Sequence, residues 1–388
     1  MKKTIRDYDL NGKKVIIRCD YNVPMDNGII LDDTRVRVST RTILYALNNG
    51  AKVILLSHLG RVKEEKDKEG NSLYPVAVFL SNLLKRKVLF SPYTRGKELT
   101  EMVNNMKKGD ILLIENTRFE DIDGNKESKC DNELSKYWAS LGDIFINDAY
   151  ASCHRNHASV TGIPKYLPSG IGFLVEREIK KIDNILISNT HPFITVLGGK
   201  KIDDKLGLIE SLVKISDKLL IGGAMSFTFL KILGYEVNDN LVSLNNLINC
   251  KKVLNNYKDK IVLPLDFVCE DGNKDINEIN KNDNCMDIGP KTIRLFRKEL
   301  KEAKRVILNG PMGIFEDKKY AKGTREIFNI LCEYKIKTVV GGGDSASAVN
   351  KLGYDGMFYH VSTGGGATME YLEKRKLEGI EVIDDAKK

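Results

Sequence analysis

The feature that most restricts the fold of this chain is a regular alternation of two kinds of segment. Short apolar runs rich in Val and Ile are followed by longer stretches with helical period. This alternation is typical of parallel sheets whose strands are joined by helices packed on the sheet faces. The chain has 388 residues, which is more than one hydrophobic core usually supports. We therefore expect an α/β protein with two domains.

Arginine marks the strand ends of the first half. Strands are expected at residues 15–18, 53–57, 111–115 and 144–147. In parallel sheets, ligands bind where the carboxyl ends of the strands meet. The basic residues at or near these ends are Arg18, Arg35, Arg61, Arg118 and Arg155, with His58, His154 and His157. Because arginine binds carboxylate and phosphate groups through paired hydrogen bonds, the first half is predicted to bind a small, doubly anionic metabolite.

Glycine marks the strand ends of the second half. Strands are expected at residues 193–197, 219–221, 306–308, 338–340 and 358–361, and they run into LGGKK, IGGAM, NGPMG, GGGDS and STGGG. Glycine lets the backbone approach a ligand and exposes N–H groups at helix starts, which can hold phosphates. A single glycine pair after a strand usually forms only a turn. Glycine segments after five strands, all at one sheet edge, predict a nucleotide site.

Common nucleotide-binding motifs are absent from the sequence. It contains no G-x-x-x-x-G-K-[ST] segment, and no G-x-G-x-x-G at a strand-to-helix turn. The HRD and DFG elements of protein kinases are also missing. The sequence therefore does not support a P-loop enzyme, a dinucleotide-dependent dehydrogenase or a protein kinase.

Charged residues accompany two of the glycine segments. Lys201 and Lys205 are four positions apart and share one face of a predicted helix. A lysine pair on a helix is usually solvated, but the glycine pair directly before this one favours contact with transferring phosphates. Asp344 follows a glycine triplet. It is either a helix N-cap or a Mg²⁺ ligand, because Mg²⁺ is commonly held by one or two carboxylates and by substrate phosphates.

The net charge, the cysteine spacing and the hydropathy of the chain indicate which partners the protein binds and in which cellular compartment it works. The net charge is +8, but Lys and Arg are dispersed among 53 acidic residues, so we expect no nucleic-acid partner. The seven cysteines contain no C-x-x-C pair and predict neither a disulfide framework nor a zinc site. No signal peptide or membrane-spanning run is visible. We expect a soluble, cytoplasmic protein.

The ordered motifs of the chain resemble those of the phosphoglycerate kinase family over essentially the whole sequence. They include RCDYNVP (18–24), SHLGR (57–61), ENTRF (115–119), VLGGKKIDDK (196–205), NGPMGIFE (309–316) and GGGDS (341–345). The resemblance implies two Rossmann-like, three-layer αβα domains with parallel sheets. It also implies a glycolytic enzyme that transfers a phosphoryl group reversibly from 1,3-bisphosphoglycerate to ADP, with Mg²⁺, giving 3-phosphoglycerate and ATP. A monomer is expected.

The resemblance assigns the site residues by position. The 3-phosphoglycerate site is expected at Asp20, Asn22, Arg35, His58, Arg61, Arg118 and Arg155. The nucleotide site is expected at Gly199, Lys201, Lys205, Gly223, Asn309, Pro311, Glu316, Gly342, Gly343, Asp344 and Ser345, with Asp344 on Mg²⁺. Arg35, Lys201 and Lys205, with backbone N–H groups near Gly343 and Gly366, are expected to stabilise charge during transfer. The accepting carboxylate is already ionised at neutral pH, so no general base is required.

Two domains joined by a hinge are expected. The N-terminal domain covers 1–172 and is completed by the tail from about 368 to 388. A hinge helix follows at 173–187, and the nucleotide domain covers 188–367. Closure at this helix and at Ser362-Thr363 is expected to bring the substrates together. The Asn- and Lys-rich segments 239–256 and 271–284 are predicted to be solvated excursions.

Several positions depart from the family pattern. Lys200 adds a positive charge before Lys201, whereas Ala224 and Cys285 replace glycines near the expected adenine pocket. Ser345 replaces Thr, and Val62 replaces Pro. The alternatives to the kinase are a nucleotide-binding regulator that lost the reaction, a kinase for a different small acid, and a nucleic-acid binder. The charged groups that the reaction needs are all present, which favours the enzyme.

Overall fold

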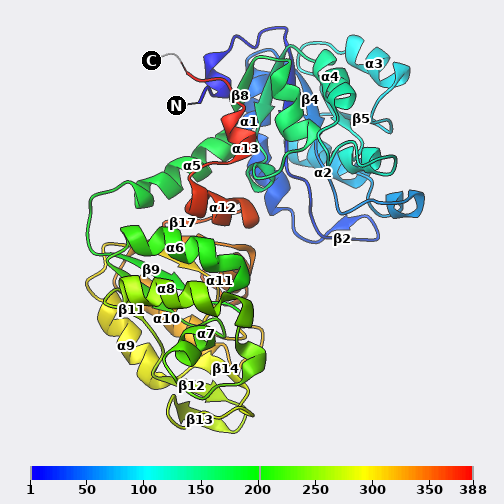
Figure 1. Cartoon of the computed structure of the whole chain (residues 1–388). Helices are drawn as coiled ribbons and strands as arrows, with labels where there is room; N and C mark the ends of the chain where they lie inside the picture. The colour runs from blue at the N-terminus through cyan, green and yellow to red at the C-terminus, as the bar shows by residue number, and fades with distance from the viewer. Residues whose placement is uncertain (1, 201, 387–388) are drawn as a thin grey trace. The chain divides into compact units, whose positions relative to one another are not determined.

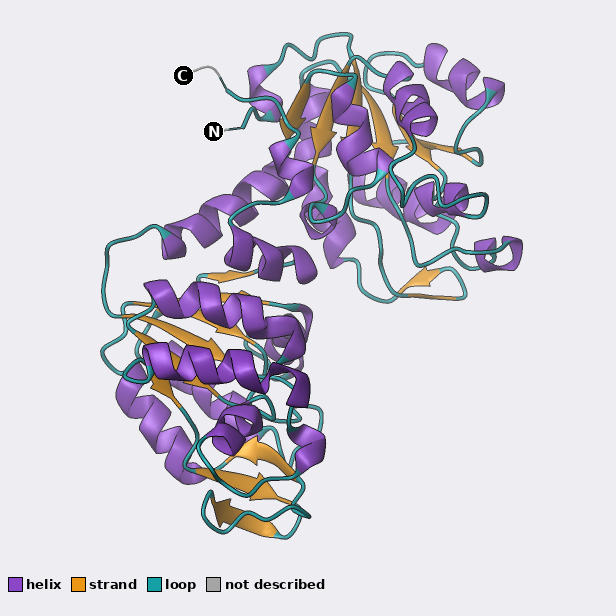
Figure 2. Cartoon of the chain, in the orientation of Figure 1, coloured by secondary structure: helices purple, strands orange, loops and turns teal. Residues whose placement is uncertain are grey.

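Two compact units make up the protein. The computed structural model describes residues 2–200 and 202–386 (Figure 1). The first unit comprises Met1–Ile179 and Lys376–Lys388, and the second comprises Lys180–Arg375. The division falls inside helix α5 (Phe173–Leu186). Each unit is built on its own parallel sheet, and helices cover the sheet faces (Figure 2).

The first unit contains a six-stranded parallel sheet with the order β5-β6-β4-β1-β7-β8. The predicted strands are found as β1 (Lys14–Arg18), β4 (Lys52–Leu56), β6 (Ile111–Ile114) and β7 (Ile144–Asn147), and β5 (Val88–Ser91) and β8 (Ser169–Ile171) are additional. Helices α1 (Thr34–Asn48), α2 (Tyr74–Leu84), α3 (Lys97–Asn104) and α4 (Asn132–Ser140) connect them. Strand β8, which the sequence analysis did not predict, pairs with β7.

The sheet of the first unit is buried on both faces. On β1, Val15 and Ile17 point to the face that packs on α1 and α2, where they join Ile43 and Leu80. Ile16, between them, is also fully buried. Strands buried on both faces read as continuous apolar runs instead of alternating ones. This burial explains why the Val- and Ile-rich runs were recognisable in the sequence.

The second unit contains a six-stranded parallel sheet with the order β11-β10-β9-β15-β16-β17. The predicted strands are found as β9 (Phe193–Leu197), β10 (Lys218–Ile221), β15 (Arg305–Asn309), β16 (Lys337–Gly341) and β17 (His360–Val361), and β11 (Ile261–Val262) is additional. Its helices are α6 (Leu206–Ile215), α7 (Ser226–Ile232), α8 (Leu247–Tyr257), α9 (Pro290–Leu300), α10 (Lys322–Glu333), α11 (Gly343–Lys351) and α12 (Gly366–Lys374). The fold class expected from the sequence is confirmed.

The two segments predicted to be solvated excursions are mostly exposed, but both contain regular structure that the prediction did not include. Residues 239–256 contain most of α8, whose Cys250, Val253 and Leu254 are buried. Their i, i+3, i+4 spacing gives the helix one narrow apolar stripe. Residues 271–284 contain β13 (Gly272–Asp275), which forms an antiparallel sheet with β12 (Asp266–Cys269) and β14 (Cys285–Ile288).

One disulfide lies in this antiparallel sheet. Cys269 of β12 is paired in register with Cys285 of β14, and their sulfur atoms are bonded. The sequence predicted no disulfide framework, and this single cross-strand bond was not anticipated. Cysteine spacing alone does not show strand register, so the sequence offered no means of finding this pair.

The C-terminal segment that returns to the first unit is shorter than the expected 368–388. Helix α12 packs on α6 and belongs to the second unit. The returning part begins at Lys376 and includes α13 (Glu378–Glu381). There the N–H of Gly379 donates to the carbonyl of Cys153 at 2.7 Å, and Asn147 donates to the carbonyl of Gly379 at 2.9 Å. The tail therefore contacts the end of β7.

Candidate functional site

The strand ends of the first unit gather a group of basic side chains. Arg155 is half-buried, and its pKa is lowered by this burial and by the positive charges of Arg118, Arg18 and Arg61. The negative charge of Asp20 raises the pKa of Arg155 and so partly offsets this lowering. Like charges affect one another in this way only at short range. The cluster formed by Arg35, His58, Arg61, Arg118 and Arg155 is called the acceptor cluster below.

Arg35 joins the acceptor cluster through Asp20. It lies in the first turn of α1, and its Nη1 donates to Oδ2 of Asp20 at 2.7 Å. The Asp20 side chain is almost fully buried, whereas about a third of the Arg35 side chain stays exposed. Nearby, the side-chain oxygen of Asn22 accepts the N–H of Gly60 at 2.9 Å. A fixed carboxylate therefore orients a guanidinium whose remaining donors can face a ligand.

Arg18 has a structural role, although it also stands at a strand end. Its side chain is fully buried. Its Nε donates to Oγ of Ser159 at 2.8 Å, and its Nη2 lies 3.2 Å from Nδ1 of His58. Glu127, which is also fully buried, accepts the N–H of Ser159 at 2.9 Å and favours the charged form of Arg18. Sequence reasoning missed Glu127, because it lies away from every strand end.

His58 and His157 are neutral at neutral pH. Burial, followed by the charges of Arg18, Arg118 and Arg155, lowers the pKa of His58 well below its ordinary value. Burial and the same arginines lower the pKa of His157 to about 3. A neutral imidazole accepts or donates hydrogen bonds but adds no positive charge. The positive charge of the acceptor cluster therefore comes from its arginines.

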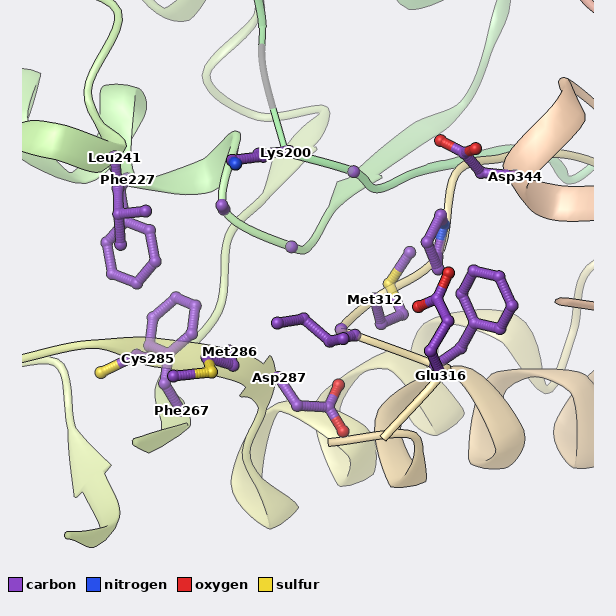
Figure 3. Close-up of a pocket in the computed structure, with 17 residues that line it drawn as sticks. Lys200, Phe227, Leu241, Phe267, Cys285, Met286, Asp287, Met312, Glu316 and Asp344 are labelled. Carbon is purple, nitrogen blue, oxygen red and sulfur yellow. The ribbon is translucent and has the colours of Figure 1, made fainter. Parts of the chain in front are cut away.

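The second unit contains a cavity of about 360 Å³ at the glycine-rich ends of its strands. This volume suits a small-molecule ligand. The lining residues are Gly199, Lys200, Gly223, Ala224, Phe227, Leu241, Phe267, Cys285, Met286, Asp287, Pro311, Met312, Gly313, Ile314, Phe315, Glu316 and Asp344. Phe227, Leu241, Phe267, Cys285 and Met286 lie on one side, and Glu316, Asp344 and Met312 lie on the other (Figure 3).

The cavity wall includes some of the predicted nucleotide residues and several others. Gly199, Gly223, Pro311, Glu316 and Asp344 were predicted and lie in the wall. The sequence analysis left Ala224 and Cys285 without a nucleotide contact, and both line the cavity. It missed the apolar residues Phe227, Leu241, Phe267, Met286, Met312, Ile314 and Phe315. Apolar residues of this kind also build ordinary cores, so no sequence signal distinguished them.

Other predicted residues hold the loops around the cavity. Asn309 donates to the carbonyl of Gly341 at 2.9 Å. Ser345 accepts the N–H of Gly310 at 2.6 Å. These bonds connect the ends of β15 and β16 to the start of α11. Lys201 lies outside the described residues.

Two helices begin at the expected glycines. Gly342, with φ of +94°, is the N-cap of α11, whose first residue is Gly343. Helix α12 likewise begins at Gly366. The first N–H groups of a helix lack intrahelical partners and can bind anions. Asp344 is the second residue of α11, so the N-cap interpretation of this residue was wrong.

Lys205 is a partly buried cation beside the cavity. Its Nζ donates to the carbonyl of Gly198 at 2.5 Å. Burial lowers the pKa of Lys205 to about 8, and the nearby carboxylates of Asp344 and Asp204 act in the opposite direction. The amine therefore loses its proton as the pH rises through about 8 in the unliganded protein.

If the cavity binds the nucleotide that the sequence predicts, kcat/KM for that nucleotide should decrease above pH about 8, because deprotonated Lys205 would no longer neutralise phosphate charge. Steady-state assays from pH 7 to 9.5, with excess coupling enzyme at each pH, would measure this decrease. The matched control is Lys205→Arg, because arginine keeps its charge over this range. A decrease of the same size in the Lys205→Arg variant would contradict the assignment to Lys205.

An arginine-rich cluster in one α/β unit and a nucleotide-sized, glycine-edged cavity in the other define the class of small-molecule phosphotransferases. The family model for phosphoglycerate kinase matches residues 5–375. The chain therefore belongs to the phosphoglycerate kinase family, and the resemblance stated from its motifs is confirmed.

Known proteins similar to this chain agree with the family. It is 48% identical to the phosphoglycerate kinase of Staphylococcus epidermidis strain RP62A, over 99% of each chain. It is 49% identical to that of Enterococcus faecalis strain V583, again over 99% of each. The structure of phosphoglycerate kinase from Coxiella burnetii is similar with a TM-score of 0.88, at 33% identity and 98% coverage of both chains.

The family assignment determines the general activity. The known reaction of phosphoglycerate kinases is the Mg-dependent phosphoryl transfer of glycolysis, and ATP and ADP are its nucleotide substrates. The chain is thus a phosphotransferase with phosphoglycerate kinase function. Within the described residues, no helix has the length and apolarity needed to cross a membrane.

Proposed function

We propose that the acceptor cluster binds 3-phosphoglycerate or 1,3-bisphosphoglycerate and that the cavity of the second unit binds ADP or ATP. The cavity is the observation that carries this assignment. Its apolar side, with Phe227 and Phe267, suits a planar base, whereas Glu316 offers oxygen atoms to a ribose. The glycines and helix starts provide N–H groups for phosphates. The acceptor cluster supplies the charge that a doubly anionic acid requires.

Asp344 is proposed to bind Mg²⁺ together with the nucleotide. Its carboxylate lines the cavity in the first turn of α11. Within residues 2–200 and 202–386, no group of three or more His, Cys, Asp or Glu side chains could form a complete metal site. One carboxylate nevertheless fits Mg²⁺, which takes most of its remaining ligands from phosphates and water. When bound, Mg²⁺ would neutralise phosphate charge.

The chain's own contribution to catalysis is proposed to be positioning and charge stabilisation. Arg35 is oriented by Asp20 at 2.7 Å, and Lys205 lies at the edge of the cavity wall, bonded to Gly198. Phosphoryl transfer spreads negative charge over the transferred oxygens. Fixed cations and the N–H groups near Gly343 and Gly366 would stabilise that charge. The acceptor carboxylate needs no general base.

Direct transfer requires the two bound substrates to meet, so we propose that the units approach one another when both are occupied. Helix α5 and the Ser362-Thr363 segment are the proposed hinges. We expect the radius of gyration, measured by small-angle X-ray scattering, to decrease toward roughly 21 Å, the value for a compact chain of this length. The controls contain one substrate each. An unchanged radius with both substrates bound would contradict closure.

A coupled assay tests the proposed substrates. Purified protein is mixed with 3-phosphoglycerate, ATP, Mg²⁺, NADH and excess glyceraldehyde-3-phosphate dehydrogenase. We expect NADH loss that requires 3-phosphoglycerate, ATP and Mg²⁺ together, and each omission serves as a control. Nucleotide binding without NADH loss would indicate a different acceptor acid. We also propose that the protein is a cytoplasmic monomer that binds no nucleic acid, as its glycolytic family and dispersed charge suggest.

A further inference from the structure

The Cys269–Cys285 disulfide lies in the wall of the proposed nucleotide cavity. Cys285 lines the cavity beside Met286 and Phe267 (Figure 3). Cys269 is fully buried directly behind it, on the neighbouring strand. The bond therefore connects β12 and β14 at the apolar side of the cavity, where the base is proposed to bind.

The two cysteines are held side by side independently of their bond. Strands β12 and β14 are antiparallel, with Phe267 opposite Ile288 and Val268 opposite Asp287. Both cysteines also belong to one buried apolar cluster that includes Phe227 and Phe267. Reduction would leave the strand pairing in place, so the two thiols would stay close enough to form the bond again, but it would remove the covalent restraint on the first residue of β14.

Strand β14 contacts the cavity wall through Met286 and Asp287 as well as through Cys285. The carbonyl of Met286 accepts the N–H of Ile314 at 3.1 Å. The carboxylate of Asp287 accepts the N–H of Gly323 at 2.6 Å and that of Ile288 at 2.9 Å. Met286, Asp287 and Ile314 all line the cavity. A shift of the first residue of β14 would therefore be transmitted to the segment that forms the opposite wall.

We propose that Cys269 and Cys285 form a reversible thiol–disulfide site that controls the affinity of the cavity for nucleotides. This inference rests on the proposed function only in placing a nucleotide in the cavity. When the bond is closed, it keeps the wall in the conformation that accepts the ligand. When the bond is open, β14 can move, and only a fraction of the molecules has the wall in the conformation that binds nucleotide. The apparent affinity for nucleotide falls in proportion to that fraction.

The chemistry requires a low-molecular-weight disulfide as oxidant. The thiolate of Cys285, the residue of the pair that lines the cavity, attacks one sulfur of that disulfide and releases a small thiolate. The thiolate of Cys269 then attacks the mixed disulfide at Cys285 and releases the second small thiolate. Each cysteine loses one proton, and the two electrons reduce the small disulfide. A small dithiol reverses both steps.

The other cysteines differ from this pair. Cys19, Cys130, Cys153, Cys250 and Cys332 are unbonded in the described structure. Burial raises the pKa of the Cys19 and Cys250 thiols to about 12, and neither residue lines the cavity. Cys332 is the partly exposed one and does not line the cavity. It therefore provides a matched control for thiol chemistry outside the site.

The test compares the full-length protein after treatment with oxidised glutathione and after treatment with dithiothreitol. Titration of denatured samples with a thiol reagent should detect five thiols in the oxidised form and seven in the reduced form. We expect the Kd for ADP, measured by calorimetry, to be roughly three- to tenfold higher after reduction. The KM for 3-phosphoglycerate should not change. Saturating ADP should also slow reduction, because it covers Cys285.

Variants distinguish this site from other effects. Cys285→Ser should abolish the response of the ADP Kd to oxidation, whereas Cys332→Ser should retain it. Cys269→Ser should stop at the mixed disulfide on Cys285, so oxidation should raise its ADP Kd instead of lowering it. The proposal is overturned if oxidation does not change the thiol count, or if the count changes while the ADP Kd stays the same. Absence of ADP binding in both states would overturn the nucleotide assignment of the cavity, and with it this proposal.

Discussion

Replacing Arg35 with alanine is expected to lower kcat by roughly 10²- to 10³-fold, the usual effect of removing one group that stabilises transition-state charge. Arg35 is suited to this role because Asp20 fixes one of its nitrogens at 2.7 Å while part of the guanidinium remains exposed. If this cation acts mainly on the transferred group, its loss should affect kcat more than the KM for 3-phosphoglycerate. Steady-state kinetics with both substrates varied would separate the two parameters.

Arg37→Ala is the matched control for this experiment. Arg37 lies on the same helix, but it forms an exposed ion pair with Asp33 at 2.7 Å. Exposed pairs of this kind contribute little to stability, so we expect kcat and both KM values to stay within about twofold. If Arg35→Ala raises KM and leaves kcat unchanged, Arg35 is a binding residue without a catalytic role.

Replacing Gly310 with alanine is expected to destabilise the second unit by about 3 kcal/mol or more, through the combined cost of backbone strain and collision. Gly310 has φ of +90°, which side chains other than glycine rarely adopt. A Cβ atom at this position would lie 2.1 Å from the carbonyl oxygen of Gly198 and 2.5 Å from Nζ of Lys205. The loops after β9 and β15 could not then approach each other as they do.

Thermal unfolding would measure this effect. A loss of that size corresponds to a decrease in Tm of roughly 6–12 °C for a unit of about 200 residues. Weaker ADP binding should accompany it, because Ser345 and Lys205 both contact this region. Gly343→Ala is the control for stability, since the space that a Cβ atom would occupy there is open and the φ of Gly343 is not left-handed. Equal Tm values for the two variants would contradict the packing argument.

The sequence predicted those features that depend on local patterns. Strands such as β1 and β9 were recognisable because both faces of each sheet are buried. The glycines at the strand ends were informative because a parallel sheet brings those ends to one edge. Five of the predicted nucleotide residues line the cavity for this reason.

Features that depend on contacts between distant segments could not be predicted. Phe227 and Phe267 form the apolar wall from a helix and from a separate antiparallel sheet. Glu127 becomes the buried partner of the Arg18 region only when its loop folds over the strand ends. The Cys269–Cys285 bond depends on strand register. None of these relations produces a periodic signal along the chain.

The return of the C-terminal segment has a consequence for the order in which the protein folds during synthesis. Lys2 forms a bridge with Asp385, and the N–H of Lys3 donates to the carbonyl of Asp384 at 2.8 Å. The first unit is therefore completed by a segment that is synthesised after the whole of the second unit. At about 5–20 residues per second, synthesis of the second unit takes roughly 10–40 s. During that interval the first unit is nearly complete but unfinished, whereas the second unit is continuous in sequence and can finish folding before it.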